Sequence, residues 1–110
     1  MTEPAGSPRD GAGRSAEWHE RLHADSGVRV DRIVSTGYSS PEGEWYDQTY
    51  HEWVMVLEGE GTLEFEDHST VTLRVGQHIT LPAHRRHRIA RTSSDPPCVW
   101  LAVYYGRESS

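Results

Sequence analysis

The chain has 110 residues, of which 35% are hydrophobic and 25% charged, and its net charge is −6 at pH 7. This length fits one globular domain, and the acidic balance argues against nucleic-acid and anionic-membrane partners, because both recruit a basic surface. No apolar run approaches the length of a membrane-spanning helix, and the N-terminus lacks the hydrophobic segment of a signal peptide. We therefore expect a cytoplasmic protein with no membrane contact.

The N-terminal part of the chain predicts a tail followed by a short helix. Residues 1–14 are rich in Gly, Pro, Ala, Ser and charge, a composition that buries too little apolar surface to fold. Residues 15–23 predict a helix, with Ser15 as its N-cap and one apolar stripe along it. The expected organisation is a disordered tail over 1–14, one domain over 15–106 and a C-terminal tail over 107–110.

From Val28 onward the sequence predicts short strands separated by turns. β-branched and aromatic residues alternate with polar ones, and Gly, Pro, Asp and Ser occupy the positions between them. The expected strands are 28–35, 45–59, 62–66, 71–75, 78–81, 87–92 and 99–105. This spacing is typical of an all-β antiparallel sandwich or barrel, and it shows no alternation of strands with helices.

The longest predicted strand, 45–59, carries the first candidate site residues. Side chains of one parity share a face of a strand, so Tyr46, Gln48 and Glu52 are expected together, with His51 on the opposite face. The residues after Glu52 are apolar on both faces, so its carboxylate needs a cation or hydrogen-bond donors. Gln48 would lie roughly 13 Å from Glu52 on an ideal strand, so a bend must shorten this distance if both contact one ion.

The segment 76–91 supplies basic side chains. His84 and His87 are three residues apart, but a nearby proline and the alternation around them favour a turn and a strand over a helix. Arg91 shares the parity of His87, so it is a candidate for the barrel interior, where it could pair with Glu52 or bind a substrate carboxylate. Two alternatives remain: the arginines form a solvated edge, or an Arg91–Glu52 pair replaces a metal ion.

Cys98 is the only cysteine, so an internal disulfide cannot form. It lies in an apolar run, which predicts a small buried core residue. A nucleophilic role for Cys98 is opposed by this setting, because a reactive thiol needs an electropositive and accessible environment.

Two segments resemble the two motifs of the cupin superfamily of small jelly-roll barrels. The first motif ends in a glutamate, six variable residues and a glycine, which fits Glu52 to Gly59. The second motif fits residues 75–91, with Gly76 and His87 at matching positions. This chain departs from the family motifs at five positions. Tyr46 and Gln48 stand where the family has a histidine pair, and Val75, His84 and Arg91 stand where it has proline, glycine and asparagine.

The resemblance covers about residues 28–105. Within this range the chain resembles a branch of small single-domain bacterial cupins. It implies a double-stranded β-helix, or jelly roll, with a site inside the barrel. The family holds a first-row divalent metal with three histidines and a glutamate, of which Glu52 and His87 carry over. Gln48 could add a carbonyl oxygen, a weaker ligand than imidazole. The implied residues are Gln48, Glu52 and His87 for the metal, and Tyr46, His84 and Arg91 for the ligand pocket.

The resemblance implies a small cupin that binds a divalent metal (iron, manganese, nickel or zinc) and a small organic ligand. Oxygenase and isomerase chemistry are both open, with no substrate indicated. The alternative is a metal-free, non-catalytic cupin that acts as a ligand-binding or dimeric scaffold module. Many small cupins form homodimers, and an apolar outer face at Trp53, Met55 and Leu57 is compatible with a homodimer and equally with a monomer.

Overall fold

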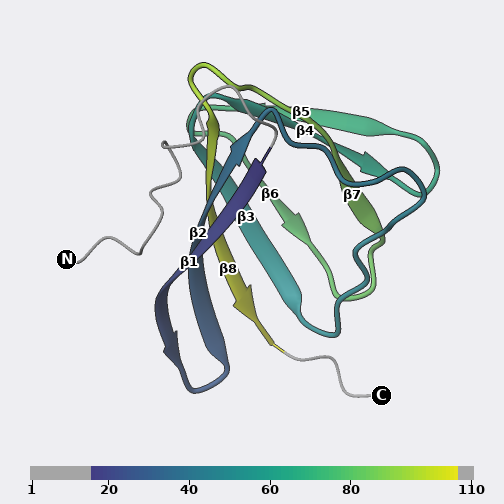
Figure 1. The fold of residues 1–110 in the computed structure, drawn as a ribbon. Helices are drawn as coiled ribbons and strands as arrows, with labels where there is room; N and C mark the ends of the chain where they lie inside the picture. Colours follow the sequence, from purple (N-terminus) through teal and green to yellow (C-terminus); the bar gives the residue numbers. More distant parts are fainter. Residues whose placement is uncertain (1–15, 107–110) are drawn as a thin grey trace.

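The computed structural model describes residues 16–106. This part of the chain contains strands and no helix (Figure 1), which confirms the all-β prediction. The strands are β1 (Ala16–Asp25), β2 (Val28–Thr36), β3 (His51–Glu58), β4 (Glu60–Phe65), β5 (Thr70–Arg74), β6 (His78–Leu81), β7 (His87–Thr92) and β8 (Cys98–Tyr105).

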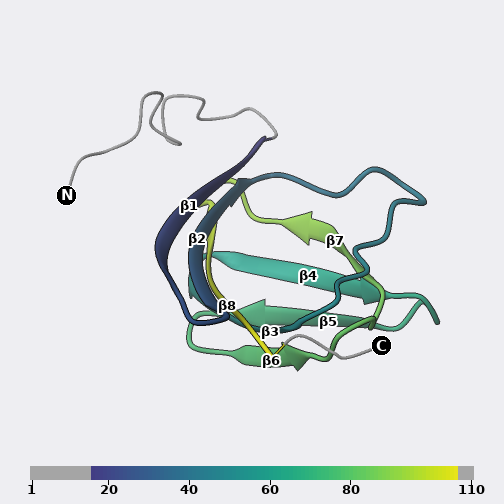
Figure 2. The same cartoon turned by 90° about the horizontal axis from the view of Figure 1, so that it is seen from below.

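The strands form two antiparallel sheets that face each other. One sheet has the order β1-β2-β8-β3-β6 and the other has the order β5-β4-β7. Neighbours such as β2 and β8 are far apart in the sequence, because the chain crosses between the sheets as it winds. In Figure 2 the strongly curved β1, β2 and β8 close one side of the barrel, while β4 and β7 lie across from β3. This arrangement is the predicted double-stranded β-helix.

The core lies between the two sheets and consists of the inward-facing residues of the strands, which alternate with outward-facing ones. Its members include Ile33, Val54, Val56, Leu63, Phe65, Leu73, Leu81, Ile89, Cys98 and Trp100. The indole Nε1 of Trp100 donates to Ser35 Oγ at 3.1 Å, so the largest core side chain keeps its polar atom satisfied. Cys98 is fully buried, as predicted, and burial raises its thiol pKa to about 12.

The predicted helix over 15–23 is wrong wherever the structure describes that segment. Residues from Ala16 onward form β1, the edge strand that pairs with β2 in antiparallel register. Cross-strand ion pairs support this pairing, with Arg21 Nε 2.9 Å from Asp31 Oδ1. Sheet pairing therefore overrides the helical pattern, which was local. Ser15 and the predicted tails over 1–14 and 107–110 lie outside the described residues.

The predicted strand over 45–59 is shorter than expected, because β3 begins at His51. The preceding residues form a loop that is held by backbone hydrogen bonds to the start of β7 and to the turn before it. Tyr46 N donates to His87 O at 2.8 Å, and His84 N donates to Gln48 O at 2.7 Å. The loop supplies the bend that the shared site of Gln48 and Glu52 requires.

The outer face of β3 carries a half-buried apolar strip. Trp53 and Met55 point away from the barrel and lie opposite Val103 and Leu101 of β8. Leu57, the third expected member, is 42% exposed. Homodimer formation through this strip stays a prediction.

Candidate functional site

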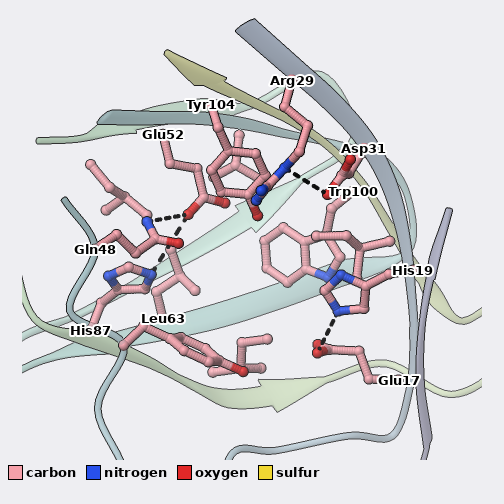
Figure 3. A pocket seen from close by; sticks show the side chains of 15 residues that line it. Glu17, His19, Arg29, Asp31, Gln48, Glu52, Leu63, His87, Trp100 and Tyr104 are labelled. Carbon is pink, nitrogen blue, oxygen red and sulfur yellow. Dashed lines mark hydrogen bonds and ion pairs between the residues drawn. The ribbon is translucent and has the colours of Figure 1, made fainter. Parts of the chain in front are cut away.

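A cavity of about 340 Å³ lies inside the barrel between the two sheets (Figure 3). Its floor is apolar and comprises Ile33, Val54, Leu63, Leu81, Ile89 and Trp100. Polar side chains gather on two walls. One wall holds Tyr46, Gln48, Glu52 and His87, and the other holds Glu17, His19, Arg29 and Asp31, with Tyr104 between them. Such a cavity, with an apolar floor and a few convergent polar groups, is typical of small-molecule sites.

Glu52 of β3 points into the cavity and is 7% exposed. Its Oε1 accepts a hydrogen bond from Gln48 Nε2 at 3.2 Å. Burial raises the pKa of the Glu52 carboxyl to about 6, against the opposing effect of hydrogen bonds from Gln48 and Tyr104. Glu52 therefore gains and loses its proton near neutral pH.

His87, the first residue of β7, is 5% exposed and lies opposite Glu52. Its Nδ1 lies 2.9 Å from the Arg85 carbonyl oxygen, which can only accept, so we assign the proton to Nδ1. Burial lowers the imidazole pKa, which favours the neutral ring. The Nε2 atom then presents a lone pair to Glu52 Oε1 at 3.8 Å. When Glu52 is ionised, two acceptors face each other and favour a cation or a donor between them.

Two tyrosines extend this polar wall. The ring of Tyr46 lies 5.4 Å from that of His87, and burial raises its pKa to about 12. Tyr104 is buried beside Glu52, and burial raises its phenol pKa as well. Both phenols are therefore neutral near pH 7. The Tyr104 hydroxyl donates to Glu52, and the Tyr46 hydroxyl bonds with Ser40 and Tyr38.

The second polar wall was missed by sequence reasoning. Arg29 and Asp31 come from β2, and Glu17 and His19 come from β1. The signal was present in β2, because Arg29 and Asp31 share parity with the apolar Ile33. It was absent for β1, because that segment was predicted to be helical.

His84 does not reach the cavity. It occupies the turn before β7 with a φ of 65°, and its Nδ1 lies 2.7 Å from Asp47 Oδ1 near the surface. His51 points away from the cavity, as parity predicted, and its Nδ1 accepts a hydrogen bond from Ala83 N at 3.0 Å.

The predicted interior position of Arg91 is wrong. Arg91 is exposed, and its Nη1 contacts Glu60 Oε2 at 2.9 Å, so the Arg91–Glu52 pair does not form. The cause is a β-bulge: Thr62 pairs with Arg91 and Leu63 pairs with Ile89, which leaves the residue between them, Ala90, as the extra one. The bulge reverses the parity of β7, so Arg91 faces solvent while Ile89 and Thr92 are buried.

Replacement of Arg91 with glutamine is expected to change the free energy of unfolding by less than about 0.5 kcal/mol, because exposed ion pairs contribute little. Arg88 provides the contrast, since it is half-buried and bonds both Glu64 and the Ser40 carbonyl at 2.7 Å. Arg88→Gln is expected to cost at least about 1 kcal/mol. Urea unfolding of both variants measures the two changes in the free energy of unfolding. Equal changes would contradict the exposed position of Arg91.

A metal ion finds few donors in the cavity. Among residues 16–106 there is no cluster of three or more His, Cys, Asp or Glu side chains suited to an ion. Glu52 and His87 supply one carboxylate and one imidazole, and the Gln48 amide can supply an oxygen if it turns away from Glu52. This donor set fits an ion held weakly and completed by water or ligand oxygens.

A family model described as "Cupin domain" matches residues 33–104. Among solved structures, a "putative mannose-6-phosphate isomerase" from Ralstonia eutropha JMP134 is 39% identical, with a TM-score of 0.80, over 89% of this chain and 90% of that one.

More distant structures share the fold alone. The EutQ protein of Clostridium difficile is 12% identical over 86% of this chain and 71% of its own, with a TM-score of 0.69. An RmlC-like cupin with a double-stranded β-helix fold from Methanocaldococcus jannaschii is 20% identical over 86% of this chain and 84% of its own, with a TM-score of 0.69. A search of curated proteins found no match.

Proposed function

Because this chain belongs to the cupin domain family, we propose that its barrel cavity binds a small polar organic molecule with Glu52 and His87 as the central contacts. The observation that carries the proposal is the pair itself. Two buried side chains from different sheets present acceptor atoms to each other at 3.8 Å inside a cavity of about 340 Å³. Burial of unpaired acceptors costs free energy. A ligand that donates a hydrogen bond to them would remove this cost, so the pair supports a binding site at this position.

A divalent first-row metal is the candidate cofactor: iron, manganese, nickel or zinc. Glu52, His87 and Gln48 would hold it. When bound, such an ion polarises a carbonyl or hydroxyl oxygen of the ligand. Because these three side chains offer few metal ligands, they are compatible with weak metal binding and equally with the alternative, a metal-free barrel that binds a ligand.

An isomerase reaction is the finer part of the proposal, and the name of the Ralstonia relative supports it. Isomerisation next to a carbonyl needs a group that removes a proton and returns it nearby. In the metal-free cavity Glu52, with a pKa raised to about 6, is suited to that task near neutral pH. The Tyr46 and Tyr104 phenols line the same cavity, and each would exchange its present hydrogen bond for one to a ligand oxygen.

The test uses untagged protein and the variants Glu52→Ala and His87→Ala, with His78→Ala as matched control. His78 lies outside the cavity, on the exposed side of β6 beside Trp53. Thermal shifts are measured with a panel of sugar phosphates, organic acids and neutral sugars. Metal content is measured after incubation with manganese, iron, nickel or zinc and buffer exchange.

We expect stabilising ligands for the wild type and His78→Ala, and a loss of affinity of about tenfold or more in the two site variants. Ligand binding that survives both substitutions would overturn the proposed site. Metal content that is negligible in the wild type and unaffected by either substitution would leave the metal-free alternative as the function.

A further inference from the structure

We propose that Arg29 forms an anion-binding subsite on the wall of the cavity opposite His87, so that the ligand carries a carboxylate or phosphate group. The inference rests on the proposed function, because it names the chemical class that the same cavity accepts. It follows from the position of Arg29, from the orientation of its guanidinium and from the pairing of the charges around it.

The strand register places Arg29 in one row with the central contacts. Arg29 of β2 is the Cα partner of Tyr104 on β8, and Tyr104 is the partner of Glu52 on β3. All three side chains line the cavity. Adjacent strands are about 4.8 Å apart, so the backbones of Arg29 and Glu52 are separated by about 10 Å. A ligand of six or so carbons would reach from one to the other.

The guanidinium of Arg29 is held by aromatic rings and points into the cavity (Figure 3). Its Cζ lies 4.2 Å from the ring centroid of Tyr104 and 5.4 Å from that of Tyr50. A guanidinium that stacks on a ring can still bind a planar anion with its N–H edge, and part of the Arg29 edge already contacts the Tyr50 and Tyr104 hydroxyls.

That edge is incompletely satisfied. The Nε atom of Arg29 is buried and has no hydrogen-bond partner. Asp31 Oδ2 lies 3.4 Å away, within ion-pair distance but without the alignment of a hydrogen bond. The Arg29 side chain as a whole is 32% exposed, and its terminal N–H groups are the donors that a carboxylate or phosphate in the cavity would meet.

The acidic residues near Arg29 have other partners. Asp31 Oδ1 accepts a hydrogen bond from Arg21 Nε at 2.9 Å, a better contact than the one with Arg29. Glu17 Oε1 lies 2.9 Å from His19 Nε2, and this contact raises the pKa of His19. Asp31 thus divides its two oxygens between Arg21 and Arg29, and among the described residues that line the cavity Arg29 is the one arginine that can meet an anionic ligand.

The test compares three probes that share one sugar ring: mannose, mannose 6-phosphate and mannuronate. The three probes differ in charge: mannose is neutral, mannose 6-phosphate carries a phosphate and mannuronate carries a carboxylate. Binding is measured from backbone amide shifts of cavity residues in ¹⁵N-labelled protein. The variants are Arg29→Met, which keeps an unbranched side chain against Tyr104, and Arg29→Lys, which keeps only the charge. Arg32→Met is the matched control, because Arg32 is on the same strand and also pairs with an acid and a ring, Glu20 and Trp18.

We expect at least one anionic probe to bind the wild type and Arg32→Met about tenfold or more tightly than mannose does. Arg29→Met should abolish that preference, and Arg29→Lys should retain part of it. Binding of all three probes with equal affinity, or an anion preference that survives Arg29→Met, would overturn the subsite while leaving the proposed function intact. An absence of shifts with every probe would count against both. If Arg29→Met does not fold, the preference for anionic probes over mannose is compared between Arg29→Lys and Arg32→Met. A preference that is equal in these two variants would overturn the subsite.

Discussion

Replacement of Gly59 with alanine is expected to destabilise the protein by at least about 3 kcal/mol. Gly59 joins β3 to β4 with a φ of +72°, a conformation that residues with a Cβ seldom adopt. A Cβ at this position would also meet Ser93 Oγ and, at 2.5 Å, the backbone oxygen of Pro97. The backbone cannot move aside cheaply, because this loop is fastened by Ser93 N donating to Glu60 O.

Gly76→Ala is the matched control for this prediction. Gly76 also has a positive φ, +83°, but a Cβ there meets nothing within 4 Å. Its substitution should therefore cost only the backbone strain, about 1–2 kcal/mol. Urea unfolding monitored by tryptophan fluorescence measures both variants. Equal losses for Gly59→Ala and Gly76→Ala would show that the close approach to Pro97 has no energetic weight.

Replacement of Glu52 with glutamine is expected to stabilise the metal-free protein above pH 7 by about 2 kcal/mol relative to wild type. The carboxyl pKa is raised from 4.5 to about 6 by burial. A raised pKa means that the protonated carboxyl favours the fold below about pH 4.5 and that this contribution is lost as the pH rises through about 6. Glutamine stays neutral throughout, so it avoids the loss.

The measurement is the free energy of unfolding of wild type and Glu52→Gln between pH 4.5 and 8 in the presence of a chelator. The difference between the two proteins should grow with pH, with its steepest change between the unfolded and folded pKa values, about 4.5 and 6. Subtraction removes the effects of groups that both proteins share. A difference that is flat with pH, or that favours the wild type at pH 8, would show that Glu52 is ionised without a desolvation penalty. A gain in stability on removing a site residue is typical of functional positions.

Some of the site was predictable because it depends on local periodicity. Parity along one strand placed Glu52 inside and His51 outside, and motif spacing brought His87 to the same cavity. Gln48 required a bend, and the loop before β3 supplies it. The burial of Cys98 followed from the apolar residues beside it. These inferences used local information: side-chain alternation along one strand for Glu52 and His51, motif spacing for His87, and apolar neighbours for Cys98.

The chain alone therefore determined the succession of strands from Val28 onward and which residues of β3 face inward, because alternation is a property of the strand itself. The tertiary structure decided the rest. Segment 16–25 is a strand because β2 offers it a hydrogen-bonding partner. Arg91 faces solvent because β7 carries an extra residue opposite β4. Arg29 takes a place in the cavity because the register of β2 on β8 sets it beside Tyr104. Pairing partners and bulges are properties of two strands at once, so no single segment encodes them.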